Sequence, residues 1–271
     1  MKPMLTLLLT LSACAATAQH CDNSLLFKPG VVLTFKTYQT YMTSPKVKYH
    51  ETTRLIVKVE AVKDSNSKRY SYITKTGVNP QNESLRYEKK YIIACDGQSF
   101  TIPIDLYFAE QVYFSNHYEN NSPAALSDTG LYASYTFNNT VALRFPVSSS
   151  SLPVQLKGDR LDGQLYRRYY EETQKAGEVG GEITDRKITS TAAASFVYSD
   201  LRLGNRLSYE VPAGSFNCQL MSLAQTIELG KASFKQEQKV YYNHRLGIVR
   251  SEHYVNTTLY TMFTELVSVQ E

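Results

Sequence analysis

The chain has 271 residues, of which 42% are hydrophobic and 20% are charged, and its formal net charge is +4 at pH 7. This composition supports a packed core and excludes a disordered chain, and the interspersed charges exclude a nucleic-acid-binding stripe or a polybasic membrane patch. The 21 tyrosines and 11 phenylalanines, with no tryptophan, favour pleated, half-buried strands.

Residues 1–18 have the features of a signal peptide. Lys2 supplies a positive charge, residues 5–13 form a short apolar run, and small residues at 16 and 18 form a cleavage site before Gln19. The apolar run is too short to span a bilayer. We therefore expect residues 19–271 to form a single exported domain that has no membrane span.

A second interpretation of the leader stays open. Residues 11–14, Leu-Ser-Ala-Cys, fit the lipobox pattern, in which the thiol of Cys14 is lipidated and becomes the new N-terminus. Lipidation would make the protein an outer-membrane lipoprotein, whereas cleavage before Gln19 would release it as a secreted or periplasmic protein. Either route takes the mature chain out of the cytoplasm.

The first half of the mature chain has the two-residue hydrophobic period that is typical of strands. Apolar residues alternate with polar ones in the segments 31–35, 55–61, 85–95 and 100–106. Between the last two segments, Asp96-Gly97 predicts a two-residue hairpin turn, because both residue types tolerate positive φ.

The middle of the chain is less regular. Residues 108–114 fit either a short helix or a strand, and two short strands are expected at 131–137 and 141–145. The serine-rich stretch 146–153 predicts a long loop that crosses between two parts of one domain.

Alternation resumes in the second half and predicts further strands at 165–173, 183–197, 207–223, 232–242, 247–255 and 259–269. The total is roughly ten to fourteen strands, and open sheets of that size usually curl or split. The predicted fold class is all-β, with one or two short helices, in which a large curved antiparallel sheet forms a half-barrel or open barrel.

Three cysteines follow the leader: Cys21, Cys95 and Cys218. In an oxidising compartment this odd number predicts one disulfide and one free thiol. Because Cys218 alternates with Phe216 and Leu220, we expect it on the inner face of its strand, which favours a Cys95–Cys218 bond. A Cys21–Cys95 bond is the alternative, and the scattered spacing argues against a metal site.

Two stretches of the C-terminal part carry a resemblance to a known family. They are residues 211–218, Val-Pro-Ala-Gly-Ser-Phe-Asn-Cys, and residues 247–252, Gly-Ile-Val-Arg-Ser-Glu. The chain resembles the TapB-like family of uncharacterised secreted bacterial proteins, which is grouped with a domain of unknown function found in cell-envelope proteins. The resemblance implies a half-barrel similar to lipoprotein carriers, which hold acyl chains in a concave apolar face, and this implication is an analogy of fold alone.

The residues of these two stretches are explained by the demands of the backbone. Pro212 lacks an N–H group and suits a strand start, and Gly214 permits a bulge or a sharp bend. Phe216 and Cys218 are expected to anchor the strand in the core, while Gly247 ends the preceding strand in a turn. We interpret all five as determinants of the fold, without a catalytic role.

Motifs for catalysis are missing from the sequence. There is no Gly-x-Ser-x-Gly elbow, no His-Glu-x-x-His pair and no phosphate-binding loop. His244 and His253 could approach each other across a hairpin beside Glu252, but exposed strand histidines are the simpler interpretation. We therefore expect no catalytic residues, no bound metal and no cofactor.

The leading functional hypothesis is a non-enzymatic, secreted or envelope-associated β protein that binds a hydrophobic or lipid-like ligand in a concave sheet. The alternative is a structural module of the cell envelope that interacts with proteins or glycans, for which an exposed tyrosine patch would be evidence. Both hypotheses predict a monomer that has no nucleic-acid partner, and the first fails if packed side chains fill the concavity.

Overall fold

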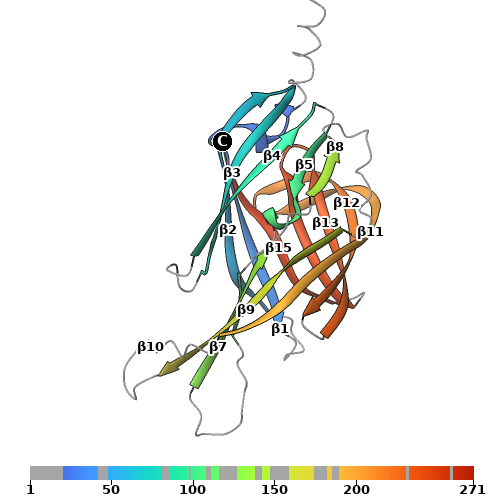
Figure 1. Ribbon diagram of the computed structural model, residues 1–271. Helices are drawn as coiled ribbons and strands as arrows, with labels where there is room; N and C mark the ends of the chain where they lie inside the picture. The colour runs from blue at the N-terminus through green and yellow to red at the C-terminus, as the bar shows by residue number, and fades with distance from the viewer. Residues whose placement is uncertain are drawn as a thin grey trace, which may run out of the picture.

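The computed structural model of the protein describes residues 21–41, 48–80, 83, 86–97, 99–107, 111–115, 127–137, 142–146, 159–173, 182–184, 189–229, 232–256 and 259–271. Within them, fifteen strands form one antiparallel sheet that curls into an open half-barrel (Figure 1). The predicted all-β class is confirmed, with one strand more than the upper expectation. The expected leader, including Cys14, lies outside the described residues.

Two short 3-10 helices, η1 (Leu25–Phe27) and η2 (Ile104–Tyr107), accompany the strands. No helix among the described residues is long and apolar enough to cross a membrane. The strands are β1 (Val32–Tyr41), β2 (Lys48–Ser65), β3 (Lys68–Val78), β4 (Arg86–Cys95), β5 (Ser99–Pro103), β6 (Gln111–Ser115), β7 (Ser127–Phe137), β8 (Ala142–Pro146), β9 (Asp159–Thr173), β10 (Glu182–Thr184), β11 (Thr189–Val211), β12 (Gly214–Leu229), β13 (Ala232–Asn243), β14 (Gly247–Asn256) and β15 (Leu259–Gln270).

The order of the strands joins the two ends of the chain in the middle of the sheet. Strands β11 to β15 are consecutive neighbours, β15 pairs with β1, and β2 to β5 continue the sheet from there. Beyond β11 the sheet continues through β9, β7 and β6, beyond β5 it ends with β8, and β10 pairs with β9. The C-terminal hairpins therefore form the central part of the sheet, next to the first strand.

Turn residues explain two of the hairpins. Asn66 and Ser67, at φ 51° and 60°, connect β2 to β3 as a two-residue turn with positive φ at both positions. At the predicted Asp96-Gly97 turn, Gly97 has φ 85°, and Asp96 Oδ1 accepts a hydrogen bond from the Ser99 N–H group at 2.7 Å. The turn is present, but β4 ends at Cys95 and β5 begins at Ser99, so the loop has three residues and not two.

The segment 207–223, which we expected to be one strand, is divided between two strands. β11 ends at Val211 and β12 begins at Gly214, and these two residues pair across a turn formed by Pro212 and Ala213. Gly214 has φ 132°. A proline in the second position and a glycine in the fourth are preferences of tight turns, so the motif reverses the chain where we had expected it to bend a single strand. Residues 108–110 lie outside the described part, and 111–115 form a strand, β6.

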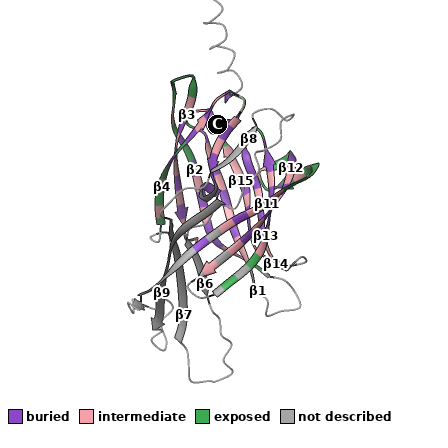
Figure 2. Cartoon of the chain, turned by 45° about the vertical axis from the view of Figure 1, so that its right-hand side comes forward, coloured by how far each residue is buried: buried purple, intermediate pink, exposed green. Residues whose placement is uncertain are grey.

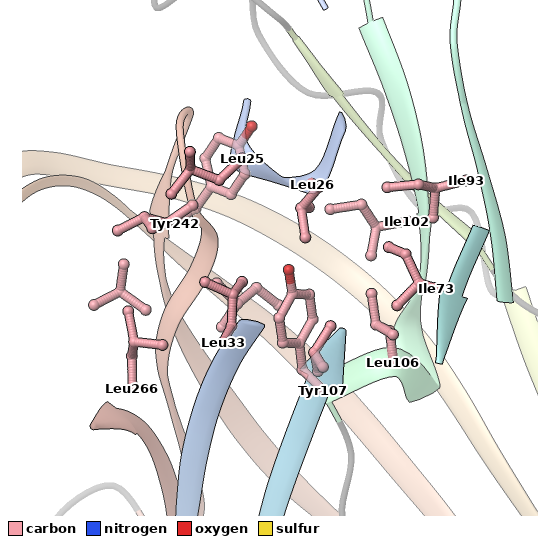
Figure 3. Packing of buried hydrophobic residues seen from close by; sticks show 14 of the residues in the cluster. Leu25, Leu26, Leu33, Ile73, Ile93, Ile102, Leu106, Tyr107, Tyr242 and Leu266 are labelled. Atoms are coloured by element: carbon pink, nitrogen blue, oxygen red, sulfur yellow. The ribbon is translucent and has the colours of Figure 1, made fainter. Parts of the chain in front are cut away.

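The hydrophobic core fills one end of the half-barrel. η1 and η2 contribute Leu25, Leu26, Leu106 and Tyr107, which pack against inward side chains from the strands (Figure 3). The strand residues drawn with them are Leu33, Ile73, Ile93, Ile102, Tyr242 and Leu266. Figure 2 shows buried residues alternating along the strands, as the sequence period predicts, with exposed residues at the β2–β3 turn and near the tip of the β11–β12 hairpin.

One disulfide joins the segment that precedes η1 to the end of strand β4. Cys21 is bonded to Cys95, with Cα atoms 6.1 Å apart, and Cys218 is a buried free cysteine. Our preferred Cys95–Cys218 bond is therefore wrong, and the alternative is correct. The bond closes a loop between residues 74 positions apart, which stabilises the fold by about 4 kcal/mol in the chain-entropy treatment.

The inner-face prediction for Cys218 came from its alternation with Phe216 and Leu220, which shows that these three residues share a face but not which face it is. Met221 pairs with Val240 of the core face and is three residues beyond Cys218, so Cys218 lies on the opposite face of β12. Cys95, in contrast, shares the core face of β4 with Ile93. Strand register therefore places the two residues on different faces of the curled sheet, although both belong to the same buried cluster.

Candidate functional site

The inner face of the sheet changes from apolar to polar along its strands. Beyond the core, eight buried polar residues form a row that we call the polar band: Thr37, Thr53, Tyr198, Gln225, Gln238, Ser251, His253 and Thr264. Each is at most 9% exposed. Buried polar side chains require hydrogen-bond partners, so such a row is an unusual feature in a place where a core would be apolar.

Strand pairing makes the polar band continuous across seven strands. Tyr198 is paired with Gln225 between β11 and β12, and Gln238 with His253 between β13 and β14. Thr264 of β15 is paired with both Ser251 of β14 and Thr37 of β1, and Thr37 is in turn paired with Thr53 of β2. Between β12 and β13 the link is diagonal, because Gln225 is paired with Gln236, which is two residues from Gln238 on the same face of β13. Cross-strand partners share a face, so the band extends from β11 to β2 on one face of the sheet.

Hydrogen bonds connect some members of the polar band and leave other atoms unmatched. Thr37 and Thr264 share a hydroxyl hydrogen bond of 2.9 Å. Gln236, next to the band on β13, contacts both Gln225 Oε1 and His253 Nδ1, the latter at 3.2 Å. Two buried amide atoms have no hydrogen-bond partner among the described residues, Gln225 Nε2 and Gln39 Oε1. These atoms have hydrogen-bonding capacity that a bound molecule could use.

His253 is uncharged at neutral pH. Its ring is 3% exposed, and this burial lowers its pKa to about 4 from the usual 6.5. A neutral imidazole offers one donor and one acceptor nitrogen. His253 therefore adds to the hydrogen-bonding character of the polar band without adding charge.

A buried lysine lies elsewhere on the inner face. Lys75 of β3 is completely buried, and its ammonium group is 5.6 Å and 5.5 Å from the ring centres of Tyr87 and Tyr91. Strand pairing places it beside Val57, four residues along β2 from the Thr53 of the polar band. Four strand residues span about 13 Å, so Lys75 belongs to the apolar end.

The outer face carries a second group of polar residues, which we call the outer cluster: Tyr209, Tyr241, Arg250, Glu252 and Glu265. Glu252 is buried and the other four are half-buried. Arg250 forms ion pairs of 2.7 Å with both Glu252 and Glu265. Burial alone would lower the pKa of Arg250, but the two carboxylates and Tyr209 outweigh it, and the pKa is raised.

The outer cluster is partly covered because the tip of the β11–β12 hairpin lies over β13, β14 and β15. The Ala213 N–H group donates to the Leu266 carbonyl of β15 at 3.4 Å, and the Tyr209 ring centre is 4.0 Å from that of Tyr241. Two register shifts in β11, between residues 199 and 206, provide the bend that brings the tip over this face. The side chain of Glu252 is consequently only 5% exposed.

The two stretches that carried the family resemblance therefore meet in space. Pro212 and Gly214 make the hairpin tip, and Arg250 and Glu252 lie on the strand that the hairpin covers. Gly247, at φ 86°, begins β14 where an added Cβ would overlap the Tyr107 hydroxyl.

The conceivable histidine pair does not form. His244 is exposed in the β13–β14 turn, whereas His253 is buried six residues along β14 from Gly247. Six strand residues span about 20 Å, which is far beyond hydrogen-bond reach. No group of three or more His, Cys, Asp or Glu residues in the described part of the chain could hold a metal ion.

The polar band is not among the features predicted from the sequence, although a signal for it is present there. In β12 the core-facing series runs Met221, Leu223, Gln225, and in β14 it runs Val249, Ser251, His253. Each series keeps the two-residue period while changing from apolar to polar side chains. Continuing the two-residue alternation past the last apolar residue of each series places these polar side chains on the inner face.

A curled antiparallel sheet with a plugged apolar end and a polar inner band defines the chain as an open β half-barrel. The chain belongs to the DUF3108-like family, whose model matches residues 34–266. The domain-of-unknown-function grouping that the resemblance implied is therefore correct. Among curated proteins no relative matches the chain.

Two solved structures are similar to the chain across most of its length. One is from Bacteroides fragilis and is described as a candidate exported protein with a YmcC-like fold, at 18% identity and TM-score 0.55, covering 90% of this chain and 97% of that one. The other is a candidate lipoprotein from Parabacteroides distasonis, at 13% identity and TM-score 0.58, covering 90% of this chain and 96% of that one. At these identities the likeness shows the fold alone.

Proposed function

We propose that this chain is an exported, envelope-associated, non-enzymatic protein that binds a lipid-like ligand and receives the ligand's polar part at the polar band. The observation that carries the proposal is the continuous row of buried polar side chains on the core face, with unmatched amide atoms at Gln225 and Gln39. A fold that had only to pack its own interior would gain more from apolar residues there.

The packed core limits where a ligand could bind. Leu25, Leu26 and Tyr107 fill the end of the half-barrel that is nearest to η1 and η2, so an acyl chain cannot occupy that end without displacing them (Figure 3). The proposal therefore assigns the ligand to the opposite, polar end of the inner face. This differs from a carrier with a uniformly apolar groove, which the half-barrel analogy had implied.

Export is supported by two independent features. Residues 1–18 have the charge, apolar run and cleavage site of a signal peptide. The two similar structures are described as a candidate exported protein and a candidate lipoprotein. The proposal includes the TapB-like subdivision of the family, one half-barrel domain over residues 19–271, and a monomeric state.

Native mass spectrometry of the full chain, purified from its own host, tests the ligand-binding proposal. We expect a co-purified small molecule that is lost on mild activation and reduced in occupancy in Gln225→Leu. Gln270→Leu, at an exposed position near the end of β15, is the matched control and should retain the ligand. Native protein that is purified without detergent and shows only the mass of the ligand-free chain would refute ligand binding.

A second candidate function, an interaction module of the envelope, has one observation in its favour. On the outer face, the rings of Tyr38 and Phe263 stack at 4.8 Å, and Tyr49 meets Phe263 edge-on at 5.3 Å while staying 47% exposed. An exposed tyrosine on a rigid aromatic base suits protein or glycan recognition. Co-sedimentation with isolated envelope glycan tests it, and equal recovery of Tyr49→Ala and the native protein would refute a role for this patch.

A further inference from the structure

The charge of the polar band restricts the chemistry of what it can bind. The side chains of the band are hydroxyls, amides, a phenol and one imidazole, and burial keeps the imidazole of His253 neutral. The buried cation of the inner face, Lys75, belongs to the apolar end and not to the band. The eight band residues therefore supply no charge to compensate a charged ligand, and the charged residue that strand pairing places beside them is an acid, Asp159 of β9, opposite Tyr198.

Burying a charged group against such a surface is costly. A carboxylate or a phosphate that loses its hydration without a cationic partner costs several kcal/mol, whereas neutral groups exchange water for protein hydrogen bonds at little net cost. A buried ammonium group would face the same penalty away from the Tyr198–Asp159 pair, because none of the eight band residues is a carboxylate. Electrostatics thus favours an uncharged head group.

The unmatched atoms of the site point to the same class of ligand. Gln225 Nε2 is a donor and Gln39 Oε1 is an acceptor, and both are buried without a partner among the described residues. Gln225 is on β12 and Gln39 is on β1, with three strands between them, so the band presents an unmatched donor near one end and an unmatched acceptor near the other. Hydroxyls and amides both accept and donate, so a head group that carries them suits either glutamine, whereas an ionised acid can only accept and suits Gln225 alone.

We infer that the polar band selects an uncharged head group that bears hydroxyls or amides, as in a glycolipid or an acylated amide, over an anionic or cationic amphiphile. This inference rests on the proposed function and specifies its ligand class. The selectivity comes from desolvation: all three kinds of head group can hydrogen-bond, but only the neutral one enters without leaving a buried charge uncompensated.

The test uses the mature chain with its disulfide intact and three amphiphiles that share a twelve-carbon chain. They are dodecyl maltoside, dodecanoate and dodecyltrimethylammonium, each titrated at pH 7.5 below its micelle concentration and followed by isothermal calorimetry. We expect dodecyl maltoside to bind at least about tenfold more tightly than either ion. Gln225→Leu and Gln39→Leu should each weaken maltoside binding, with folding verified by circular dichroism, and Gln270→Leu should not.

The possible outcomes separate this inference from the proposed function. Binding of dodecanoate or dodecyltrimethylammonium as tightly as dodecyl maltoside would overturn the neutral-ligand inference and leave lipid-like binding standing. Binding of none of the three, together with a clean apo mass for protein from its own host, would overturn both. If the host protein carries a ligand but binds none of the probes, its accurate mass and charge decide: a neutral head group supports the inference and an ionised one overturns it.

Discussion

Gly247 and Gly30 offer a matched pair of positions for testing how the β13–β14 turn packs on the core. Both have φ 86°, so an alanine at either position experiences the same backbone strain. At Gly247 the new Cβ would overlap the Tyr107 hydroxyl and approach Leu26 Cδ1 to 3.2 Å, whereas at Gly30 it would meet no atom within 4 Å. The difference between the two variants therefore isolates the steric contact.

The expected magnitudes follow from these two costs. Left-handed backbone strain at a non-glycine residue is about 1–2 kcal/mol, and this should be the whole effect of Gly30→Ala. Overpacking against Tyr107 and Leu26 adds about 1–3 kcal/mol, so Gly247→Ala should lose about 2–5 kcal/mol of unfolding free energy. The larger loss arises because Tyr107 is held in the plugged end of the half-barrel and cannot easily move aside.

Equilibrium unfolding in urea, followed by far-ultraviolet circular dichroism with the disulfide intact, measures both losses. The double variant Tyr107→Phe/Gly247→Ala removes the overlapping hydroxyl and should recover about 1 kcal/mol relative to the sum of the single changes. Equal losses for Gly247→Ala and Gly30→Ala would show that the packing of Tyr107 on this turn is not as described. If the double variant recovers no unfolding free energy, the Tyr107 hydroxyl is not the cause of the larger loss in Gly247→Ala.

Two further predictions concern buried charge. Arg250→Met should destabilise the protein by about 3–5 kcal/mol in the same urea assay, because it leaves Glu252 and Glu265 buried without their cation; a loss below about 1 kcal/mol would mean that the outer cluster is hydrated. Because burial lowers the pKa of His253 to about 4 from 6.5, the unfolded chain binds its proton first, and stability should fall by about 3 kcal/mol as the pH decreases from about 6.5 to 4. His253→Gln should flatten this part of the pH profile, and an unchanged slope would refute the assignment.

Local sequence signals predicted much of the fold because they depend on neighbouring residues alone. The two-residue period identified the strands, since alternate side chains of a strand face opposite sides of the sheet. The number of strands required a curled sheet, and the open half-barrel agrees with that requirement. The residues of the Pro212–Gly214 stretch predicted a constrained backbone conformation. They form a hairpin turn, and not a bend within one strand.

Other features depended on residues that are far apart in the sequence. Alternation fixes which residues share a face, but it cannot say which face is the inner one, so Cys218 was assigned to the inner face, whereas the register of β12 and β13 puts it on the face opposite Met221. The Cys21–Cys95 pairing required the position of η1 against the end of β4, which no local pattern encodes. The buried state of Arg250 and Glu252 likewise depends on the docking of a hairpin tip about forty residues earlier in the chain.

The sequence by itself determined the strands, their turns and the class of the fold, because hydrophobic period and turn chemistry act over a few residues. Only the tertiary structure decided what the inner face is made of: β1 lies beside β15, and seven strands place their polar side chains in one row. Each of those residues is ordinary within its own strand. They form a row because strands from distant segments of the chain pair with one another, and that pairing is set by the closure of the sheet as a whole.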